Sequence, residues 1–365
     1  MTLPNSSDAV LEPAGAEQRF DVLDEAFRLI ADRGDRSVVE REILLAGRRV
    51  TFRVAGEALA SSLTAPFAHL PAAPAATGTP ELTIHAVDRS IHAAPRPAPA
   101  PAAGGDVLWD SPEHQVTASG DGRFVAHLIR ESGSEWCLDR MENRIAGAVA
   151  STSRLTLYER GKGFQLLLPF WLRRMGLQLI HAAVVSWHGR GILVAGSNGT
   201  GKSTTALTCL AHGFGYLGDD YIALESHPDG SFSGHSIYSC AFLEPDHLER
   251  FASLRPHAIP GFYPLETKLL LLLKDVYPGR LPPVTPLHYL LLPEIEGHGP
   301  TAISPASRAE ALRQLAPSCL MMAGRPEPDG LRCLARLVKG LECYRLRLGA
   351  DLAAIPRQVA TLVDS

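Results

Sequence analysis

The chain has 365 residues, a formal net charge of −4, 45% apolar residues and 20% charged residues. This composition is typical of a globular protein with room for two domains, and the small net charge gives no reason to expect a nucleic acid or a membrane surface as a partner. The first 20 residues contain three acids and no apolar run of signal-peptide length, so we expect a cytoplasmic protein.

Residues 1–160 are predicted to form a smaller, β-rich α+β domain. After a tail over residues 1–17, apolar residues at helical spacing predict a helix over 18–32, and a second helix is expected over Ser61–Leu70. Short apolar runs predict the strands Val38–Leu45, Arg49–Val54, Glu81–Ala86, Asp106–Trp109 and Arg123–Arg130. Residues 93–105, rich in proline and alanine, predict a mobile linker, with an ordered surface crossing as the alternative.

Residues 161–365 are predicted to form an α/β domain with a mainly β core. An apolar helix is expected over 164–176, and its stripe of Phe164, Leu167, Phe170 and Trp171 is interpreted as core packing rather than as a substrate groove. The further elements are strands over His181–Trp187, Ile192–Ala195, Phe214–Leu217, Leu269–Leu273, Tyr289–Leu292 and Tyr344–Leu348, a hairpin at 188–191, and helices over Lys202–His212, Leu352–Leu362 and from the Ser307-x-x-Glu310 capping box to Leu315.

A glycine-rich segment lies between the strand that ends at Ala195 and the helix that begins at Lys202. It reads Gly196-Ser197-Asn198-Gly199-Thr200-Gly201-Lys202-Ser203 and fits the P-loop pattern G-x-x-x-x-G-K-[ST]. The glycines allow successive backbone N–H groups to point at an anion, and the start of the helix adds partial positive charge.

These residue types predict the binding of a nucleoside triphosphate, with Mg·ATP as the expected ligand. Lys202 is expected to bind the β- and γ-phosphates, Ser203 to offer its hydroxyl to Mg²⁺, and Thr204 to supply the next hydroxyl of the turn. An ordinary glycine-rich turn is the alternative, and it would leave the Lys202-Ser203 pair unexplained.

The acid pair Asp219-Asp220 is the second feature with chemical meaning. The helix over Lys202–His212 descends about 16 Å at roughly 1.5 Å per residue. A strand from Phe214 climbs back at roughly 3.3 Å per residue, so about five residues return the chain to the phosphates. One carboxylate is then expected near Mg²⁺ and the other as a general base, with a solvated turn as the alternative. The spacing leaves open which aspartate has which role.

This short return resembles the HPr kinase/phosphorylases and, more distantly, the ATP-dependent phosphoenolpyruvate carboxykinases. The resemblance covers Leu179–Leu224, where the family pattern has a histidine before the first strand, a hairpin glycine, the P-loop and an Asp-Asp pair. Farther along, Lys268 and Cys343-Tyr344-Arg345-Leu346 resemble later landmarks of HPr kinase-related proteins, including lasso-peptide tailoring kinases. The chain lacks the Glu-x-Arg-Gly signature of true HPr kinases, so phosphorylation of HPr itself is not implied. The family positions are occupied by His181, Lys202, Ser203, Asp219 and Asp220.

The resemblance implies an HPr kinase-like domain with a phosphoenolpyruvate carboxykinase-like core that transfers the γ-phosphoryl group of ATP to a hydroxyl. It implies a serine of a peptide or protein as one acceptor, and relatives of this kind often assemble as homo-oligomers. His181 is expected to assist proton transfer or to be structural, and Lys268 to neutralise the transferring group or to be a surface lysine. A small-metabolite kinase, a slow ATP-hydrolysing module that switches shape, and a carboxykinase-like enzyme remain as alternatives.

Overall fold

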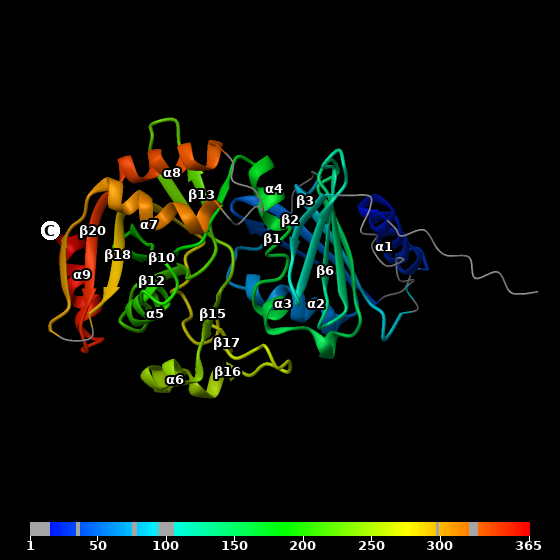
Figure 1. Cartoon of the computed structure of the whole chain (residues 1–365). Coiled ribbons are helices and arrows are strands. Elements are labelled where there is room, and N and C mark those ends of the chain that lie inside the picture. Colours follow the sequence, from blue (N-terminus) through cyan, green and yellow to red (C-terminus); the bar gives the residue numbers. More distant parts are fainter. Residues whose placement is uncertain are drawn as a thin grey trace, which may run out of the picture.

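The computed structural model describes residues 15–33, 37–74, 79–92, 94, 106–296, 299–320 and 328–365. These residues form a mixed α/β structure with two large mixed sheets and one small sheet (Figure 1). Apart from Ala94, the predicted linker over 93–105 lies outside the described residues. Within the described residues, no helix combines the length and the apolarity that crossing a membrane requires.

The first large sheet consists of β1 (Val38–Leu45), β2 (Arg48–Ala55), β3 (Leu82–Asp88), β4 (Asp106–Asp110), β5 (His114–Ala118), β6 (Phe124–Ile129), β7 (Ser134–Asp139) and β8 (Arg144–Val149). Their spatial order is β1-β2-β3-β8-β7-β6-β5-β4. The β2–β3 and β3–β8 pairs are parallel, and the other neighbours are antiparallel. β1 turns into β2 through Ala46 and Gly47, whose φ angles of 49° and 75° suit a tight two-residue hairpin.

Helix α1 (Ala16–Ala31) covers one face of this sheet. Its Phe20, Leu23 and Phe27 repeat at three- and four-residue spacing, and they join a buried cluster with Phe124 and other residues of that face. The structure confirms the helix that the apolar spacing predicts over 18–32 to within a residue or two at each end.

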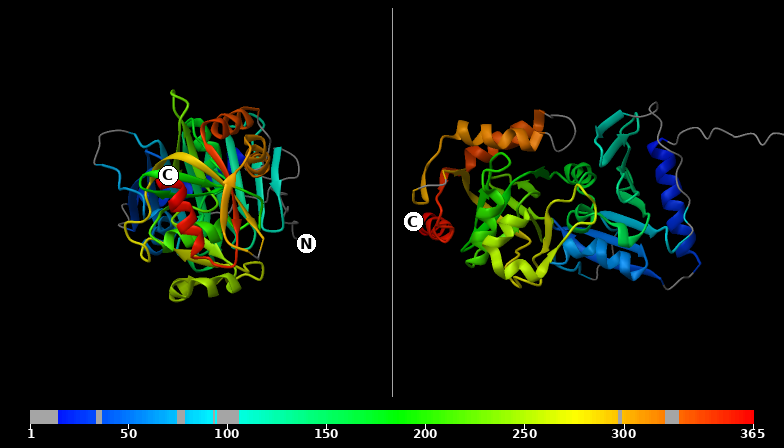
Figure 2. Two further views of the ribbon diagram at one scale, coloured as in Figure 1. Left: turned by 90° about the vertical axis from the view of Figure 1, so that its left-hand side faces the viewer. Right: turned by 60° about the horizontal axis from the view of Figure 1, so that its bottom comes forward.

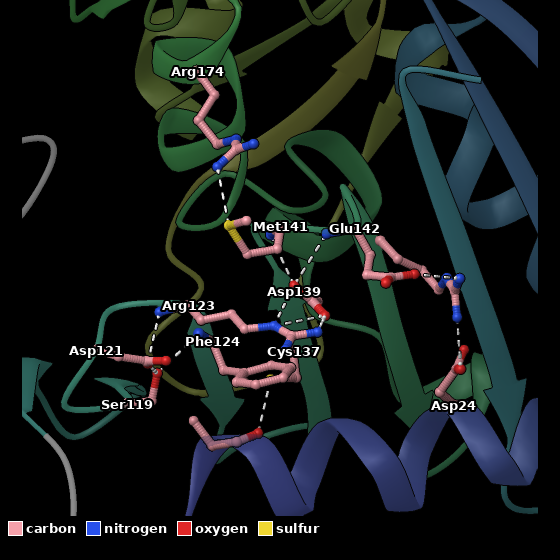
Figure 3. Close-up of polar contacts among 12 residues, drawn as sticks. Asp24, Ser119, Asp121, Arg123, Phe124, Cys137, Asp139, Met141, Glu142 and Arg174 are labelled. Atoms are coloured by element: carbon pink, nitrogen blue, oxygen red, sulfur yellow. Dashed lines mark hydrogen bonds and ion pairs between the residues drawn. The ribbon is translucent and has the colours of Figure 1, made fainter. Parts of the chain in front are cut away.

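A polar network ties α1 to the turn after β7 (Figure 3). Asp139 ends β7 and accepts hydrogen bonds from Arg123 at 2.6 Å and from the backbone N–H of Met141 at 2.8 Å. On the helix, Asp24 is buried and accepts a hydrogen bond from Arg144 at 3.0 Å. Charged donors therefore satisfy the buried carboxylates at both ends of the network.

The opposite face of the first sheet is covered by α2 (Glu57–Thr64), η1 (Ala65–Phe67), α3 (Leu157–Gly161) and α4 (Leu168–Arg174). The apolar core beneath these segments includes Leu138 and Trp171, and it continues to Tyr238 and Phe242 in the second half of the chain. One core thus crosses the domain boundary that the sequence predicts near residue 160. That boundary stays a prediction.

The second large sheet consists of β9 (Gln178–Ile180), β10 (Ala183–Trp187), β11 (Arg190–Val194), β12 (Gly215–Gly218), β13 (Ile222–Ser226), β14 (Phe232–Ser236), β18 (Val284–Ile295), β19 (Ala302–Pro305) and β20 (Glu342–Leu348). Seven strands follow the order β12-β10-β11-β18-β14-β13-β9, while β20 pairs with both β18 and β19. The central strand β18 runs parallel to β11 and to β20. Its run Leu290–Leu292 is buried, as expected of a strand with both faces covered.

Two pairs of helices cover the faces of the second sheet. α5 (Lys202–Ala211) and α9 (Ala354–Asp364) share one buried cluster, and α7 (Arg308–Leu320) and α8 (Pro328–Gly340) share another on the opposite face. Figure 2 shows α1 and α9 at opposite ends of the molecule, so both large sheets lie between them.

The small third sheet lies beside the second one. It consists of β15 (Cys240–Leu243), β16 (Ala258–Ile259) and β17 (Leu269–Leu272), with β17 in the middle. Two helical segments, α6 (Pro245–Leu248) and η3 (Glu249–His257), lie between β15 and β16 in the sequence. In Figure 1 this sheet and α6 form the lower edge of the molecule. Its middle strand carries the predicted apolar run at Leu269–Leu273.

Several predicted elements differ from the structure. The helix predicted over 164–176 is shorter, because Phe164 has a φ angle of 63° that an α-helix does not allow. The helix predicted over Ser61–Leu70 begins four residues earlier and ends as a 3₁₀ turn containing Pro66. Leu167 and Trp171 are fully buried and belong to the core of the first sheet, as interpreted from the apolar stripe.

Candidate functional site

The glycine-rich segment Gly196–Ser203 connects the end of β11 to α5. Gly199 and Gly201 have φ angles of 81° and 102°, in the region that favours glycine. At Gly201, a Cβ atom would also lie 2.5 Å from Cδ1 of Leu348 in β20. The chain therefore makes a tight turn from strand to helix at which only glycine fits, and the first helical residue is Lys202.

The side chain of Lys202 folds back into this turn. It is buried, and its Nζ donates hydrogen bonds to the backbone carbonyls of Gly196 at 2.8 Å and Ser197 at 3.0 Å. The hydroxyl of Thr200 donates to the same carbonyl of Ser197 at 2.9 Å. Asn198 is exposed at the outer side of the turn. The ammonium group thus lies inside the loop, behind an exposed stretch of backbone.

Asp219 lies near the start of α5, directly after the strand β12 that returns from the end of that helix. β12 runs antiparallel to β10, and Asp219 follows it directly with 3% of its surface exposed. Ser203 and Tyr216 lie close enough to lower the pKa of its carboxyl group, while the Tyr216 hydroxyl donates a hydrogen bond to the backbone carbonyl of Cys240 at 3.1 Å. Burial, together with the charge of Asp220, raises the pKa of Asp219 to about 7. The structure therefore brings together the P-loop serine and the first acid of the pair.

Asp220 faces two different nitrogen groups. Nε2 of His181 lies 3.0 Å from its Oδ1 atom, and the ammonium of Lys162 contacts its Oδ2 atom. Burial would raise the pKa of Asp220, but the Lys162 charge and the His181 hydrogen bond together hold it well below its usual range. Asp220 is therefore ionised at neutral pH, while its neighbour Asp219 titrates near that pH.

Lys162 is a site residue that the sequence reasoning missed. It follows α3, and only 4% of its side chain is exposed. Its Nζ lies 4.4 Å from the ring centre of Phe242 and 5.5 Å from that of Tyr221. The weak signal in the sequence was a lysine between two glycines at the start of an apolar stretch, and nothing in that pattern points to residue 220.

Lys268 and Thr204 lie near the site, but in the part of the chain that the structure describes neither makes a hydrogen bond or ion pair with Asp219 or Asp220. Lys268 precedes β17 and is half-buried. Burial lowers the pKa of Lys202, the carboxylates of the acid pair raise it, and the charge of Lys268 lowers it further, which places Lys268 within electrostatic reach of the loop. Thr204 is half-buried in the first turn of α5.

The structure thus gathers Lys202, Ser203, Asp219, Asp220 and His181 around one turn, from three separate stretches of sequence. The catalytic, nucleotide-binding and metal-binding roles that the sequence assigns to these residues, and to Lys268, remain predictions. Cys240 is a buried free cysteine, and burial raises the pKa of its thiol above the ordinary value.

Comparison with known proteins gives partial matches. No protein-family model matches the chain. HPr kinase/phosphorylases from Bacillus mycoides (strain KBAB4) and Bacillus cereus (strain G9842) are each 30% identical to it over 104 residues. The matched segment covers 28% of this chain and 28% of each relative, so the chain spans little more than a quarter of the length of these proteins.

Among solved structures, the HPr(Ser) kinase/phosphatase from Coxiella burnetii is 13% identical, with a TM-score of 0.27 over 51% of this chain and 94% of that one. The sequence match to the two Bacillus proteins supports the resemblance to the HPr kinase-like family that the sequence predicts.

Proposed function

We propose that this chain is an ATP-dependent phosphotransferase that moves the γ-phosphoryl group of Mg·ATP to the hydroxyl of a serine in a peptide or protein. At a coarser level, the relatives named HPr kinase/phosphorylase support a kinase- or phosphatase-type function. One observation carries the proposal. The acid pair lies between two groups, because Asp219 is close to the P-loop residue Ser203 and Oδ1 of Asp220 lies 3.0 Å from Nε2 of His181.

The loop has the features that a triphosphate needs. The start of the ten-residue helix α5 directs backbone N–H groups toward the turn, and the Lys202 ammonium lies within it. At Gly199, a Cβ atom would have no neighbour within 4 Å, so this part of the loop is open to solvent. These residues would bind and orient the nucleotide and exclude water from its terminal phosphate.

The donor set fits Mg²⁺ bound together with a nucleotide. Among the described residues, no group of three His, Cys, Asp or Glu side chains could hold a metal ion alone. Ser203 and Asp219 offer a hydroxyl and a carboxylate, the hard oxygen donors that Mg²⁺ prefers beside phosphate and water. When bound, Mg²⁺ would neutralise negative charge on the phosphates. Asp219 would have to release its proton to serve as a ligand.

Asp220 and His181 belong to the acceptor side in this proposal. Asp220 is ionised, so it can accept a hydrogen bond from the attacking hydroxyl. Its low pKa makes it a weak base, which is sufficient because phosphoryl transfer has a loose transition state in which the hydroxyl proton leaves late. His181 holds one oxygen of that carboxylate, and Lys268 would add positive charge near the transferred group.

The test follows the terminal phosphate of ATP. The purified protein is incubated with Mg²⁺ and ATP labelled in its γ-phosphate, in one tube with a pool of serine-containing peptides and in another with a mixture of hydroxylated metabolites. We expect label on a peptide as phosphoserine. Label on a metabolite alone would contradict the peptide acceptor, and release of free phosphate without transfer to either pool would contradict the kinase.

The variant Asp220→Asn tests the role of Asp220 in the same transfer assay. The exchange removes the proton acceptor while keeping the shape of the side chain, so transfer should fall by about 10²- to 10⁴-fold. Asp32→Asn is the matched control, because Asp32 is an exposed residue at the end of α1. Equal loss of transfer in both variants would point to a damaged fold rather than to catalysis.

A further inference from the structure

The backbone around Lys162 is fixed by tight packing. Its N–H donates to the carbonyl of Tyr158 at 2.7 Å, which closes the last turn of α3. At Gly161, a Cβ atom would lie 2.7 Å from Cδ1 of Leu270 and 2.8 Å from Cζ of Phe242. The end of α3 is therefore pressed against β15 and β17, and no larger residue would allow that approach.

The side chain of Lys162 leaves this anchored position for the acid pair. Three aromatic rings surround its ammonium, with centres at 4.4 Å for Phe242, 5.5 Å for Tyr221 and 5.9 Å for Tyr158. A buried ammonium is costly unless it is paired, and the carboxylate of Asp220 supplies that pair. Burial lowers the pKa of Lys162, but the charges of Asp220 and Asp219 outweigh it and raise the net value, so the group stays charged.

Asp220 is consequently held from two sides. Lys162 contacts its Oδ2 atom and His181 lies at its Oδ1 atom. A carboxylate with both oxygens engaged by different elements cannot rotate freely about its last bond. Asp219 has different neighbours, Ser203 and Tyr216, so the two acids lie in separate environments.

We propose that Lys162 is a positioning residue for phosphoryl transfer, which fixes the Asp220 carboxylate beside the P-loop from outside the P-loop unit. The inference rests on the proposed function, and it goes beyond the family motif because Lys162 lies 17 residues before the Leu179–Leu224 segment that carries the resemblance. Helix α3 then contributes to the site, because its packing against β15 and β17 fixes the position of the Lys162 ammonium.

A double-mutant cycle tests whether Lys162 acts through Asp220. The variants are Lys162→Met, which keeps the apolar stem of the side chain, Asp220→Asn, and the two together. Transfer of labelled phosphate and the KM for Mg·ATP are measured for each. We expect Lys162→Met to lower kcat by about 30-fold through misplacement of Asp220, with the KM changed by less than about threefold.

In the Asp220→Asn background, the same Lys162→Met exchange should lower kcat by no more than about threefold, because the group that it positions is already gone. A loss of about 30-fold in both backgrounds, or wild-type kcat in Lys162→Met, would overturn the inference. Arg160→Met is the matched control, since Arg160 is a half-buried cation of the same helix with no described contact to the acid pair.

A charge-retaining variant keeps the inference testable if Lys162→Met does not fold. Lys162→Arg is then compared in the wild-type and Asp220→Asn backgrounds, and its effect on kcat must vanish in the second. An effect of equal size in both backgrounds would overturn the inference. Absence of transfer by the wild-type protein would instead overturn the proposed function and this inference with it, so the two failures are distinguishable.

Discussion

Nε2 of His181 lies 3.0 Å from Oδ1 of Asp220, although 39 positions separate the two residues in sequence. The contact follows from strand pairing. β9 and β13 are antiparallel, with Ile180 at the end of β9 opposite Ile222 at the start of β13. The residues that follow Ile180 therefore lie beside the residues that precede Ile222. The histidine is therefore positioned by the sheet that underlies the acid pair and not by the glycine-rich loop.

His181→Ala should lower kcat by about 10- to 100-fold, the value of one hydrogen bond to a charged group. The KM for Mg·ATP should stay nearly constant, because the nucleotide side of the site is untouched. Steady-state transfer assays at varied ATP concentration measure both quantities. His188→Ala is the control, since His188 also lies 3.0 Å from an aspartate, Asp364, but on the exposed surface. Equal kcat in the two variants would contradict a role for His181.

Lys202→Ala should abolish transfer and weaken ATP binding by at least about tenfold, because it removes the cation inside the loop. Calorimetric titration with ATP and the transfer assay measure the two effects. Lys339→Ala serves as the control, since Lys339 is exposed near the end of α8. Wild-type transfer rates in Lys202→Ala would contradict the assignment of the P-loop.

Gly201→Ala should weaken ATP binding by about tenfold or more without unfolding the protein. A methyl group there would meet Leu348 at 2.5 Å, and the φ angle of 102° is strained for alanine. Gly199→Ala separates the two causes, because Gly199 lies in the same loop with a φ angle of 81° but has no atom within 4 Å of the added group. If both variants bind ATP like the wild type, the loop does not depend on its glycine geometry.

The buried side chain of His127 should make the stability of the first sheet sensitive to acid. Burial lowers its pKa from 6.5 to about 3, and its Nε2 atom lies 3.2 Å from Nδ1 of His114. Since the folded protein keeps His127 neutral while the unfolded chain becomes protonated, its contribution to stability is complete above pH 6.5 and is lost as the pH falls toward 3. The loss between pH 7 and pH 5 should be about 2 kcal/mol.

Urea unfolding of the wild type and of His127→Gln at these two pH values measures this effect. The variant should show a pH dependence that is shallower by about 2 kcal/mol, whereas the exposed His188→Gln should follow the wild type. Parallel pH dependences for the wild type and His127→Gln would contradict the neutral buried histidine.

Gly147→Ala should destabilise the first sheet by about 1–3 kcal/mol through overpacking. Gly147 lies opposite Trp136 in the β7–β8 pairing, and an added Cβ atom would lie 2.0 Å from the indole ring. Thermal unfolding compares it with Gly120→Ala, where the added atom meets nothing within 4 Å. Similar melting temperatures for both variants would show that Trp136 can move away without cost.

Features of this protein that depend on local spacing were predictable from the amino-acid sequence. The P-loop pattern, the helix that begins at Lys202 and the returning strand before Asp219 are encoded within 25 consecutive residues, because glycine, lysine and helix geometry act over a few residues. The helix α1 followed from apolar periodicity, and the buried part of β18 followed from an uninterrupted apolar run.

The distant groups that complete the site became apparent from the packing of the folded chain. Lys162 reaches Asp220 because α3 packs against the third sheet, and no local pattern encodes that approach. The different partners of Asp219 and Asp220, which separate their pKa values, also depend on it. Burial and ion pairing are properties of the packed chain, so the electrostatics of this acid pair could not be obtained from the spacing of its residues.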